Sequence, residues 1–225
     1  MRLANLAGAV LFMSCCGWAS LVENPSFETP NLTGGIMYRP TVPNVDWTFT
    51  GSAGVTAAAG AGTGFNLASV PYGNQAGFIQ KTGTIDQTLA GLDTTNTYMI
   101  SFFSATRPDI GMAPLFYGGG EDFDIYWDDT LIGTYLPTLT TFSYYTTLEF
   151  QPTSSTGVLS FRGLDSNTDC GSATPCDRTA FIDNVEITDT SISPEPSSAV
   201  LIFTGVALIG FGIRRKLAGV GSVSR

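Results

Sequence analysis

Acidic side chains are concentrated in the stretch GGGEDFDIYWDD, residues 118–129. Carboxylates at this density can coordinate calcium, which takes about 6 to 8 oxygen ligands in proteins. Two carboxylates that face one cleft, roughly 5 to 9.5 Å apart, can also hydrolyse a glycosidic bond. The acids of this stretch are Glu121, Asp122, Asp124, Asp128 and Asp129, and the first three are the candidates for a hydrolase.

The pattern of the same stretch favours a structural interpretation. In FDIYW, residues 123–127, alternate positions are large and apolar, which predicts a strand with one buried face. Asp124 is then expected on the solvent face, and Asp128-Asp129 before LIGTY is typical of a hairpin turn. We therefore favour a solvated strand and turn over an ion site, and an ion site over catalysis.

Composition argues against several other functions. The chain has no histidine, the commonest general base and transition-metal ligand, and no Gly-x-Ser-x-Gly elbow. Residues 20–193 carry 18 acidic and 5 basic side chains, so clustered cations for nucleic acid are lacking. We expect a non-catalytic protein that does not bind nucleic acid.

Exposed aromatic side chains with polar neighbours are what sugar binding requires. Tyr117, beside three glycines, is the best candidate for exposure, and Arg107 and Asp109 could bond sugar hydroxyls. Trp47 and Trp127 are expected in the core, because large aromatic bodies dominate burial. The further candidates are Tyr72, Tyr126, Tyr144 and Tyr145, with Asn74 as another polar partner.

Two cysteines lie close together in CGSATPC. The loop between Cys170 and Cys176 is rich in Gly, Ser and Pro, and it can bend enough to bring the sulfurs together in an oxidising compartment. A local disulfide is expected. A metal site is the weaker alternative, because two thiolates without histidine do not complete a tetrahedral shell.

The N-terminus has the layout of a secretory signal. Arg2 precedes the apolar run Leu6 to Met13, and small residues follow in CCGWAS. We expect residues 1–20 to be removed and the protein to leave the cytoplasm.

The C-terminus combines a Pro-Glu-Pro, an apolar stretch and three cations. Ala199 to Ile213 would reach roughly 23 Å as a helix, which is marginal for a membrane span. Basic residues after the stretch favour a cytoplasmic end. A plain C-terminal membrane anchor is the less favoured alternative to the sorting signal described next. The flanking residues are Pro194, Glu195 and Pro196 before it, and Arg214, Arg215 and Lys216 after it.

Residues 193–216 resemble the PEP-CTERM sorting signal of Gram-negative bacteria. The resemblance implies recognition by an exosortase, transient anchoring in the inner membrane, and delivery to the cell surface or the extracellular matrix. Residues 217–225 would then form a cytoplasmic tail.

The central region, residues 21–190, shows short strand-like runs separated by turn residues. Regular turn signals between them predict one all-β domain, an antiparallel β-sandwich. The Gly and Ala tract at 51–65 is expected to be a long loop. The predicted strands include 98–105, 123–127, 144–150, 157–163 and 180–188.

Several segments of this region resemble galactose-binding-like jelly rolls, a fold that includes many carbohydrate-binding modules. They are ENPSFETP, DWTFTGSAGV, GFIQKTGTIDQTLAGL, YMISFFSATRP and FIDNVEI, in that order. The resemblance implies binding of extracellular polysaccharide. It also implies a structural calcium ion at Glu28 and Asp183, with Asn24 nearby. Alternatively, these two carboxylates cap turns or accept backbone N–H bonds.

The sequence thus predicts an exported surface or matrix protein that binds or associates with extracellular polysaccharide. A glycoside hydrolase built on residues 121–124 and a protein-binding adhesin are the alternatives.

Overall fold

The structure is a computed structural model, and it describes residues 21–43, 45–58, 65–108, 120–165 and 178–191. These residues form nine strands and no helix, in agreement with the predicted all-β class. The strands are β1 (Ile36–Tyr38), β2 (Thr48–Ala57), β3 (Gln75–Ala90), β4 (Tyr98–Thr106), β5 (Phe123–Trp127), β6 (Thr130–Tyr135), β7 (Ser143–Thr146), β8 (Thr156–Gly163) and β9 (Ala180–Asp189).

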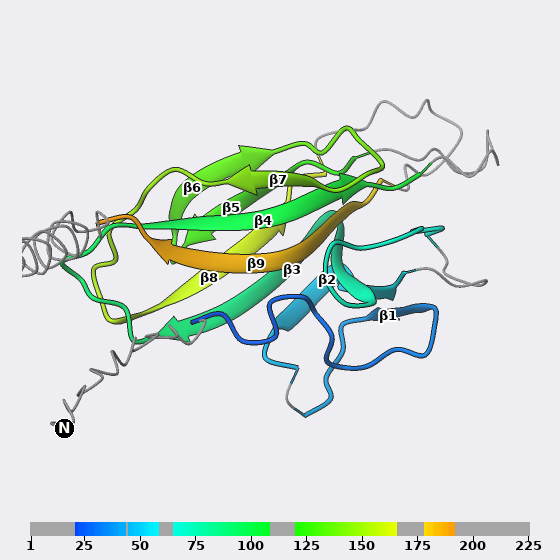
Figure 1. The fold of residues 1–225 in the computed structure, drawn as a ribbon, viewed down its shortest axis with the longest axis horizontal. Helices are drawn as coiled ribbons and strands as arrows, with labels where there is room; N and C mark the ends of the chain where they lie inside the picture. The colour runs from blue at the N-terminus through cyan, green and yellow to red at the C-terminus, as the bar shows by residue number, and fades with distance from the viewer. Residues whose placement is uncertain (1–20, 44, 59–64, 109–119, 166–177, 192–225) are drawn as a thin grey trace, which may run out of the picture.

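The strands form one antiparallel sheet that curls into two layers (Figure 1). β3 pairs with β2 along one edge, while its other edge pairs first with β9 and then with β8. The sheet divides at this point into a β9-β4-β7 layer and a β8-β5-β6 layer. Lys81 has a positive φ of 51°, so the long strand bends between its two sets of partners.

Aromatic side chains fill the space between the layers. The ring of Phe102 in β4 lies 6.0 Å from that of Phe123 in β5 and 5.6 Å from that of Phe161 in β8. Edge-to-face pairs at this spacing are favourable beyond their burial. Trp47 and Trp127, 1% and 4% exposed, belong to the same core, as the sequence predicts.

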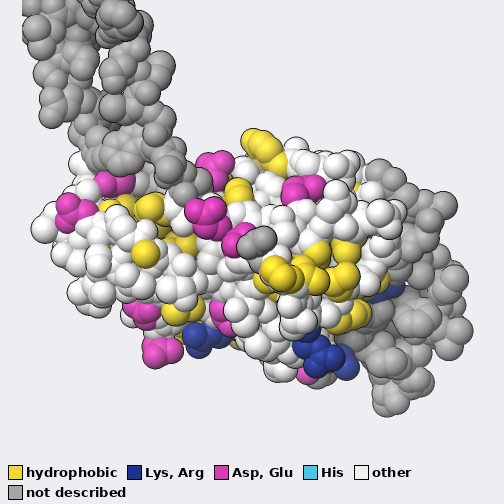
Figure 2. Space-filling view, turned by 90° about the horizontal axis from the view of Figure 1, so that it is seen from below, with side chains coloured by type: hydrophobic (Ala, Val, Ile, Leu, Met, Phe, Trp, Pro, Cys, Tyr) yellow, Lys and Arg dark blue, Asp and Glu magenta, His cyan; other side chains and the backbone are white. Residues whose placement is uncertain are grey.

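A second, smaller apolar cluster lies on the opposite side of β3, β9 and β4. Phe65 and Leu67, from the segment after β2, pack there against Phe78 and Phe181. This cluster holds the segment against the outer face of the sheet. The face seen in Figure 2 is mainly uncharged, with scattered acidic side chains and few basic ones.

Part of one predicted loop is a strand. The tract at 51–65 was expected to be irregular, but β2 continues through it as far as Ala57. Gly54 has no room for a side chain, because a Cβ there would collide with the Met37 carbonyl of β1. Close strand packing, and not loop flexibility, explains the glycine at this position.

No helix among the described residues has the length and hydrophobicity to cross a bilayer. The predicted signal peptide and the predicted span at 199–213 lie outside the described ranges.

Candidate functional site

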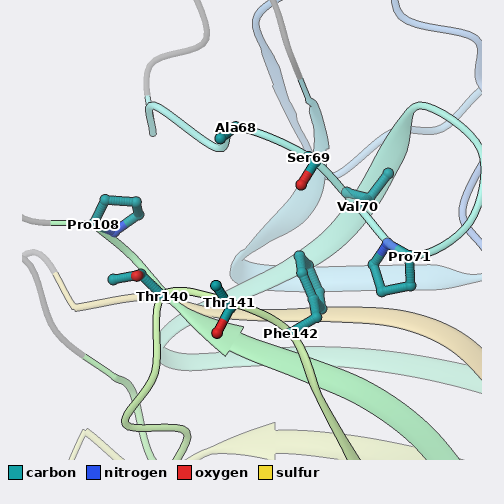
Figure 3. A pocket seen from close by; sticks show the side chains of 8 residues that line it. All are labelled: Ala68, Ser69, Val70, Pro71, Pro108, Thr140, Thr141 and Phe142. Atoms are coloured by element: carbon teal, nitrogen blue, oxygen red, sulfur yellow. The ribbon is translucent and has the colours of Figure 1, made fainter.

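A cleft of about 370 Å³ lies between two loops at one end of the sheet. Figure 3 shows the two walls facing each other, with the ring of Phe142 between Thr141 and Pro71. We refer to this site as the loop cleft. Its lining consists of Ala68, Ser69, Val70, Pro71, Pro108, Thr140, Thr141 and Phe142.

Buried anchors position both walls. Phe65 and Leu67 fix the first wall on the smaller apolar cluster, and Val70 and Phe142 pack partly against that cluster. On the second wall, the amide of Thr106 at the end of β4 donates to the carbonyl of Leu139 at 2.8 Å. The cleft is therefore built from loops that are tied to strands.

Three aromatic rings in mutual contact lie beside the segments that line the loop cleft. Phe103 in β4 is the Cα partner of Tyr144 in β7, so both side chains lie on the same face. Ring centroids are 5.4 Å apart for Phe103 and Tyr144, and 6.0 Å apart for Tyr72 and Phe103. Tyr72 and Tyr144 are 49% and 59% exposed. We call these three residues the aromatic row.

Two carboxylates hold the segment that carries Tyr72. Asp183 Oδ2 accepts the amide of Tyr72 at 2.9 Å, and Glu28 Oε1 accepts the amides of Asn74 and Gln75 at 2.8 and 2.9 Å. Gly73 is required between them, because it has a φ of +65° and a Cβ there would collide with Glu28. The predicted carboxylate pair thus accepts backbone N–H bonds.

Asp183 is fully buried, and burial raises its pKa to about 7. The nearby charge of Glu28 also contributes to this raised pKa, and bonds from the amides of Tyr72 and Asn184 and from Ser26 oppose it. A cation beside the pair would remove the repulsion between the two carboxylates.

The third predicted calcium ligand is engaged elsewhere. Asn24 Oδ1 accepts the amide of Thr29 at 3.1 Å, and its amide group donates to the carbonyls of Thr29 and Val45. Within the described ranges no group of three or more acidic or cysteine ligands occurs. A calcium ion at Glu28 and Asp183 would therefore need backbone carbonyls and water to complete its shell.

Glu121 and Asp124, two of the three candidate acids for a hydrolase, are held in separate environments. Glu121 is 3% exposed and accepts the amide of Asp165 at 3.0 Å and that of Lys81. Asp124 accepts the hydroxyls of Tyr126 at 3.1 Å and Thr134 at 2.5 Å.

The exposure predicted for Asp124 is wrong. It lies on the face opposite Phe123 and Ile125, as the alternation indicates, but it is only 8% exposed. Thr134 reaches it from the neighbouring strand β6, which the pattern of β5 alone does not reveal. The turn at residues 128–129 is as predicted, with Asp128 at a φ of 52°.

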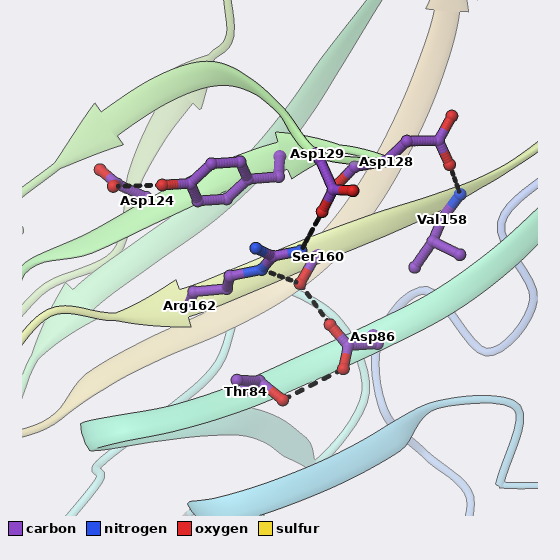
Figure 4. Close-up of polar contacts among 9 residues, drawn as sticks. Thr84, Asp86, Asp124, Asp128, Asp129, Val158, Ser160 and Arg162 are labelled. Carbon is purple, nitrogen blue, oxygen red and sulfur yellow. Dashed lines mark hydrogen bonds and ion pairs between the residues drawn. The ribbon is translucent and has the colours of Figure 1, made fainter.

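A polar network covers the outer face of β5, β8 and β3 (Figure 4). The guanidinium of Arg162 lies 4.3 Å above the ring of Tyr126 and 3.7 Å from a carboxylate oxygen of Asp129. Its Nε donates to Ser160, whose hydroxyl donates to Asp86. Arg162 thus occupies one face of Tyr126, a predicted sugar platform.

Two of the remaining predicted sugar ligands are at least partly buried, and two lie outside the described residues. Arg107 is 5% exposed with its guanidinium 4.8 Å over the Phe65 ring, beneath the first wall of the cleft. Tyr145 is partly buried against Phe102, 5.6 Å between centroids. Outside the described residues lie Asp109, Tyr117, the cysteines Cys170 and Cys176, and the sorting residues Pro194, Glu195, Pro196, Arg214, Arg215 and Lys216.

Sequence reasoning missed most of the loop cleft. Ser69, Thr140 and Thr141 are short polar residues in irregular segments, and no local pattern distinguishes them from ordinary loop residues. Phe103 was included in a predicted strand, but its outward direction follows only from the burial of Phe102 beside it.

A second cleft of about 320 Å³ lies at the opposite end of β4, beside Phe150, which pairs with Tyr98. Its lining includes Trp127, Leu131, Leu148, Glu149 and Thr153.

No family model matches the chain, and no curated protein matches it either. Among solved structures, a family 61 carbohydrate-binding module in complex with β-1,4-galactotriose aligns at a TM-score of 0.47 and 12% identity. That alignment covers 76% of this chain and 99% of the module. A family 36 module in complex with calcium and xylotriose gives 0.37 and 16%, covering 53% and 84%. Tandem family 22 modules from Paenibacillus barcinonensis give 0.42 and 13%, covering 72% and 47%.

Enzymes occur among the similar structures as well. The enzymatically active domain of tailspike protein 4 of bacteriophage CBA120 aligns at a TM-score of 0.43 and 15% identity, covering 76% of this chain and 21% of that one. All these TM-scores are below 0.5, so the site must be interpreted from its own residues.

The described lining of the loop cleft contains no ionisable side chain. It offers hydroxyl groups, backbone groups and apolar surface, which can bind an uncharged, hydroxyl-rich ligand.

Proposed function

We propose that this chain is a non-catalytic protein that binds extracellular polysaccharide in the loop cleft. The observation that carries the proposal is the lining of that cleft, which combines three hydroxyl side chains with apolar side chains. Sugars present the same combination, with hydroxyl groups around a ring whose C–H groups are apolar.

Each part of the lining has a role in such a complex. Ser69, Thr140 and Thr141 can donate and accept hydrogen bonds. Each can therefore pair with a sugar hydroxyl that acts as the acceptor or as the donor. Pro71 and the ring of Phe142 supply apolar surface for the sugar ring. These side chains come from loops fixed by buried anchors, so little order has to be gained on binding.

A non-catalytic role is supported by the positions of the acids. Glycoside hydrolysis requires two carboxyl groups that face one cleft. Glu121 and Asp124 accept bonds from different groups, and neither lines the loop cleft. The hydrolase alternative predicts new reducing ends when the protein is incubated with polysaccharide, and a reducing-sugar assay on the mixture would detect them.

We also propose that calcium binds beside Glu28 and Asp183. The pair fits a cation because both carboxylates are close enough to repel each other and Asp183 is fully buried. Bound calcium would neutralise the pair and fix the segment that leads into the first wall of the cleft.

Export and sorting complete the proposal. The N-terminal signal would direct the chain out of the cytoplasm, and an exosortase would recognise Pro194, Glu195 and Pro196 while the C-terminal span holds the protein in the inner membrane. The final location would be the cell surface or the extracellular matrix. Epitope tagging before residue 193, followed by fractionation with and without exosortase, tests this part.

Binding is tested by titrating the full-length chain with neutral polysaccharides, including β-1,4-galactan and xylan. Ala68→Trp places a large side chain in the loop cleft, and we expect it to weaken binding at least about tenfold. Thr153→Trp puts the same side chain in the second cleft and serves as the matched control. Unchanged affinity in Ala68→Trp, or a loss confined to Thr153→Trp, would place the sugar elsewhere.

A further inference from the structure

We infer that the aromatic row extends the loop cleft into one site for several consecutive units of a neutral polysaccharide chain. This inference rests on the proposed function and concerns its ligand. The row and the cleft are continuous through the chain, because Tyr72 follows Pro71, and Tyr144 is two residues after Phe142.

The geometry of the row suits a chain of rings. Phe103 and Tyr144 lie on adjacent strands with centroids 5.4 Å apart, and Tyr72 adds a third ring 6.0 Å from Phe103. Each of these spacings is comparable with the width of one sugar ring. The two tyrosines are about half exposed, so their rings remain available to a ligand that already occupies the cleft.

The charges around the row determine the chemical class of the ligand. Among the described residues, the cleft lining and the row contain no charged side chain. The charged groups that bond the segment behind Tyr72 are the carboxylates of Asp183 and Glu28. A polymer of uronic acids would find no cationic side chain in the described lining or in the row to pair with its carboxylates, whereas an uncharged glycan needs none.

The row therefore contributes only when the ligand is longer than the cleft can hold. A short oligosaccharide contacts the cleft alone, and added units contact the rings of the aromatic row. Affinity should rise with chain length until the row is covered and then level off.

The test is calorimetric titration of the full-length chain in a detergent without a sugar head group. The ligands are β-1,4-linked galacto- and xylo-oligosaccharides from disaccharide to hexasaccharide, and oligogalacturonates of the same lengths. We expect the affinity for one neutral series to increase about tenfold from disaccharide to tetrasaccharide. Tyr144→Ala should remove that increase and leave disaccharide affinity within about twofold.

Two variants serve as controls. Tyr144→Phe keeps the ring and should retain the length dependence, and Leu148→Ala removes a side chain that is 71% exposed in the second cleft and should behave as wild type. Affinity independent of length, equal losses at every length in Tyr144→Ala, or preference for oligogalacturonates would overturn the inference and leave the proposed function intact. Failure of wild type to bind any glycan would overturn the proposed function itself.

Discussion

Glu121 illustrates how strongly a single buried acid can affect this fold. Its carboxylate lies near the bend of β3, where it accepts amides from Lys81 and Asp165. Its pKa is raised from 4.5 to about 7, mainly by burial and to a smaller extent by the charges of Asp122 and Asp165, against the lowering effect of the two amide bonds. The folded state therefore prefers the protonated acid, and its ionisation at higher pH costs stability.

We predict that Glu121→Gln is more stable than wild type at pH 8 and equal to it near pH 4. The stability that the protonated acid contributes is complete below pH 4.5 and is lost as the pH rises to about 7. Glutamine keeps the acceptor oxygen without the charge, so the gain at pH 8 should be about 1–3 kcal/mol. Urea unfolding at the two pH values measures it.

The exposed acid Glu149 provides the control for this experiment. Glu149→Gln should change stability by less than about 0.5 kcal/mol at both pH values. If Glu121→Gln gave the same difference from wild type at pH 4 and pH 8, the ionisation of Glu121 would not be the cause.

The burial of a single residue was predictable from sequence only where its neighbours along the chain determine it. Alternation in β5 correctly placed Phe123 and Trp127 in the core. It did not predict the burial of Asp124, because the hydroxyl that helps to cover that carboxylate belongs to Thr134 on β6. Contacts between strands are not encoded in the pattern of either strand alone.

At the scale of elements, the carboxylate pair joins three segments that are distant in sequence. Glu28 lies in the N-terminal loop, Asp183 in β9, and the amides that they bind in residues 72–75 before and at the start of β3. A cation bound there would stabilise all three together, because it would bind the folded arrangement and not the unfolded chain.

We therefore predict that millimolar calcium raises the unfolding midpoint of wild type by several degrees relative to chelator. Asp183→Asn should abolish the increase, because it removes one of the two carboxylates. Asp189→Asn, at the far end of the same strand, is the matched control and should keep it. Equal midpoints of wild type in calcium and in chelator would contradict the calcium proposal.

A glycine in these elements can have either of two causes, close strand packing or a loop. The tract at 51–65 was predicted as a loop from its composition, yet Gly54 lies within β2 because β1 approaches too closely for a side chain. Sequence alone does not distinguish a glycine required by packing from one that marks a loop.

The whole molecule has two distinct ends (Figure 1). Thr190, beyond the end of β9, bonds the carbonyl of Thr97 just before β4, whereas the loop cleft lies beyond Thr106 at the other end of that strand. β4 separates the two by nine residues, roughly 30 Å of extended chain. A protein held through its C-terminal segment would present the cleft away from the point of attachment.

The fold was more predictable than the site for a physical reason. Strand alternation and turn residues are local signals, and the predicted strand at 98–105 agrees with β4 to within one residue. The loop cleft combines residues 68–71 with residues 140–142, which only the folded sheet brings together. Tyr72 and Tyr144 were recognised as candidates by residue type, but their shared neighbour Phe103 was not.

The most direct test of the account is hydrogen–deuterium exchange of the full-length chain with and without a neutral β-1,4-linked oligosaccharide at saturating concentration. Bound sugar should slow exchange at residues 68–72 and 140–144, because it covers those loops and opposes their local opening. Residues 148–153 of the second cleft should exchange at the same rate in both samples. Protection that falls at 148–153, or on the outer face of β5 and β8, with none at the loop cleft, would contradict it.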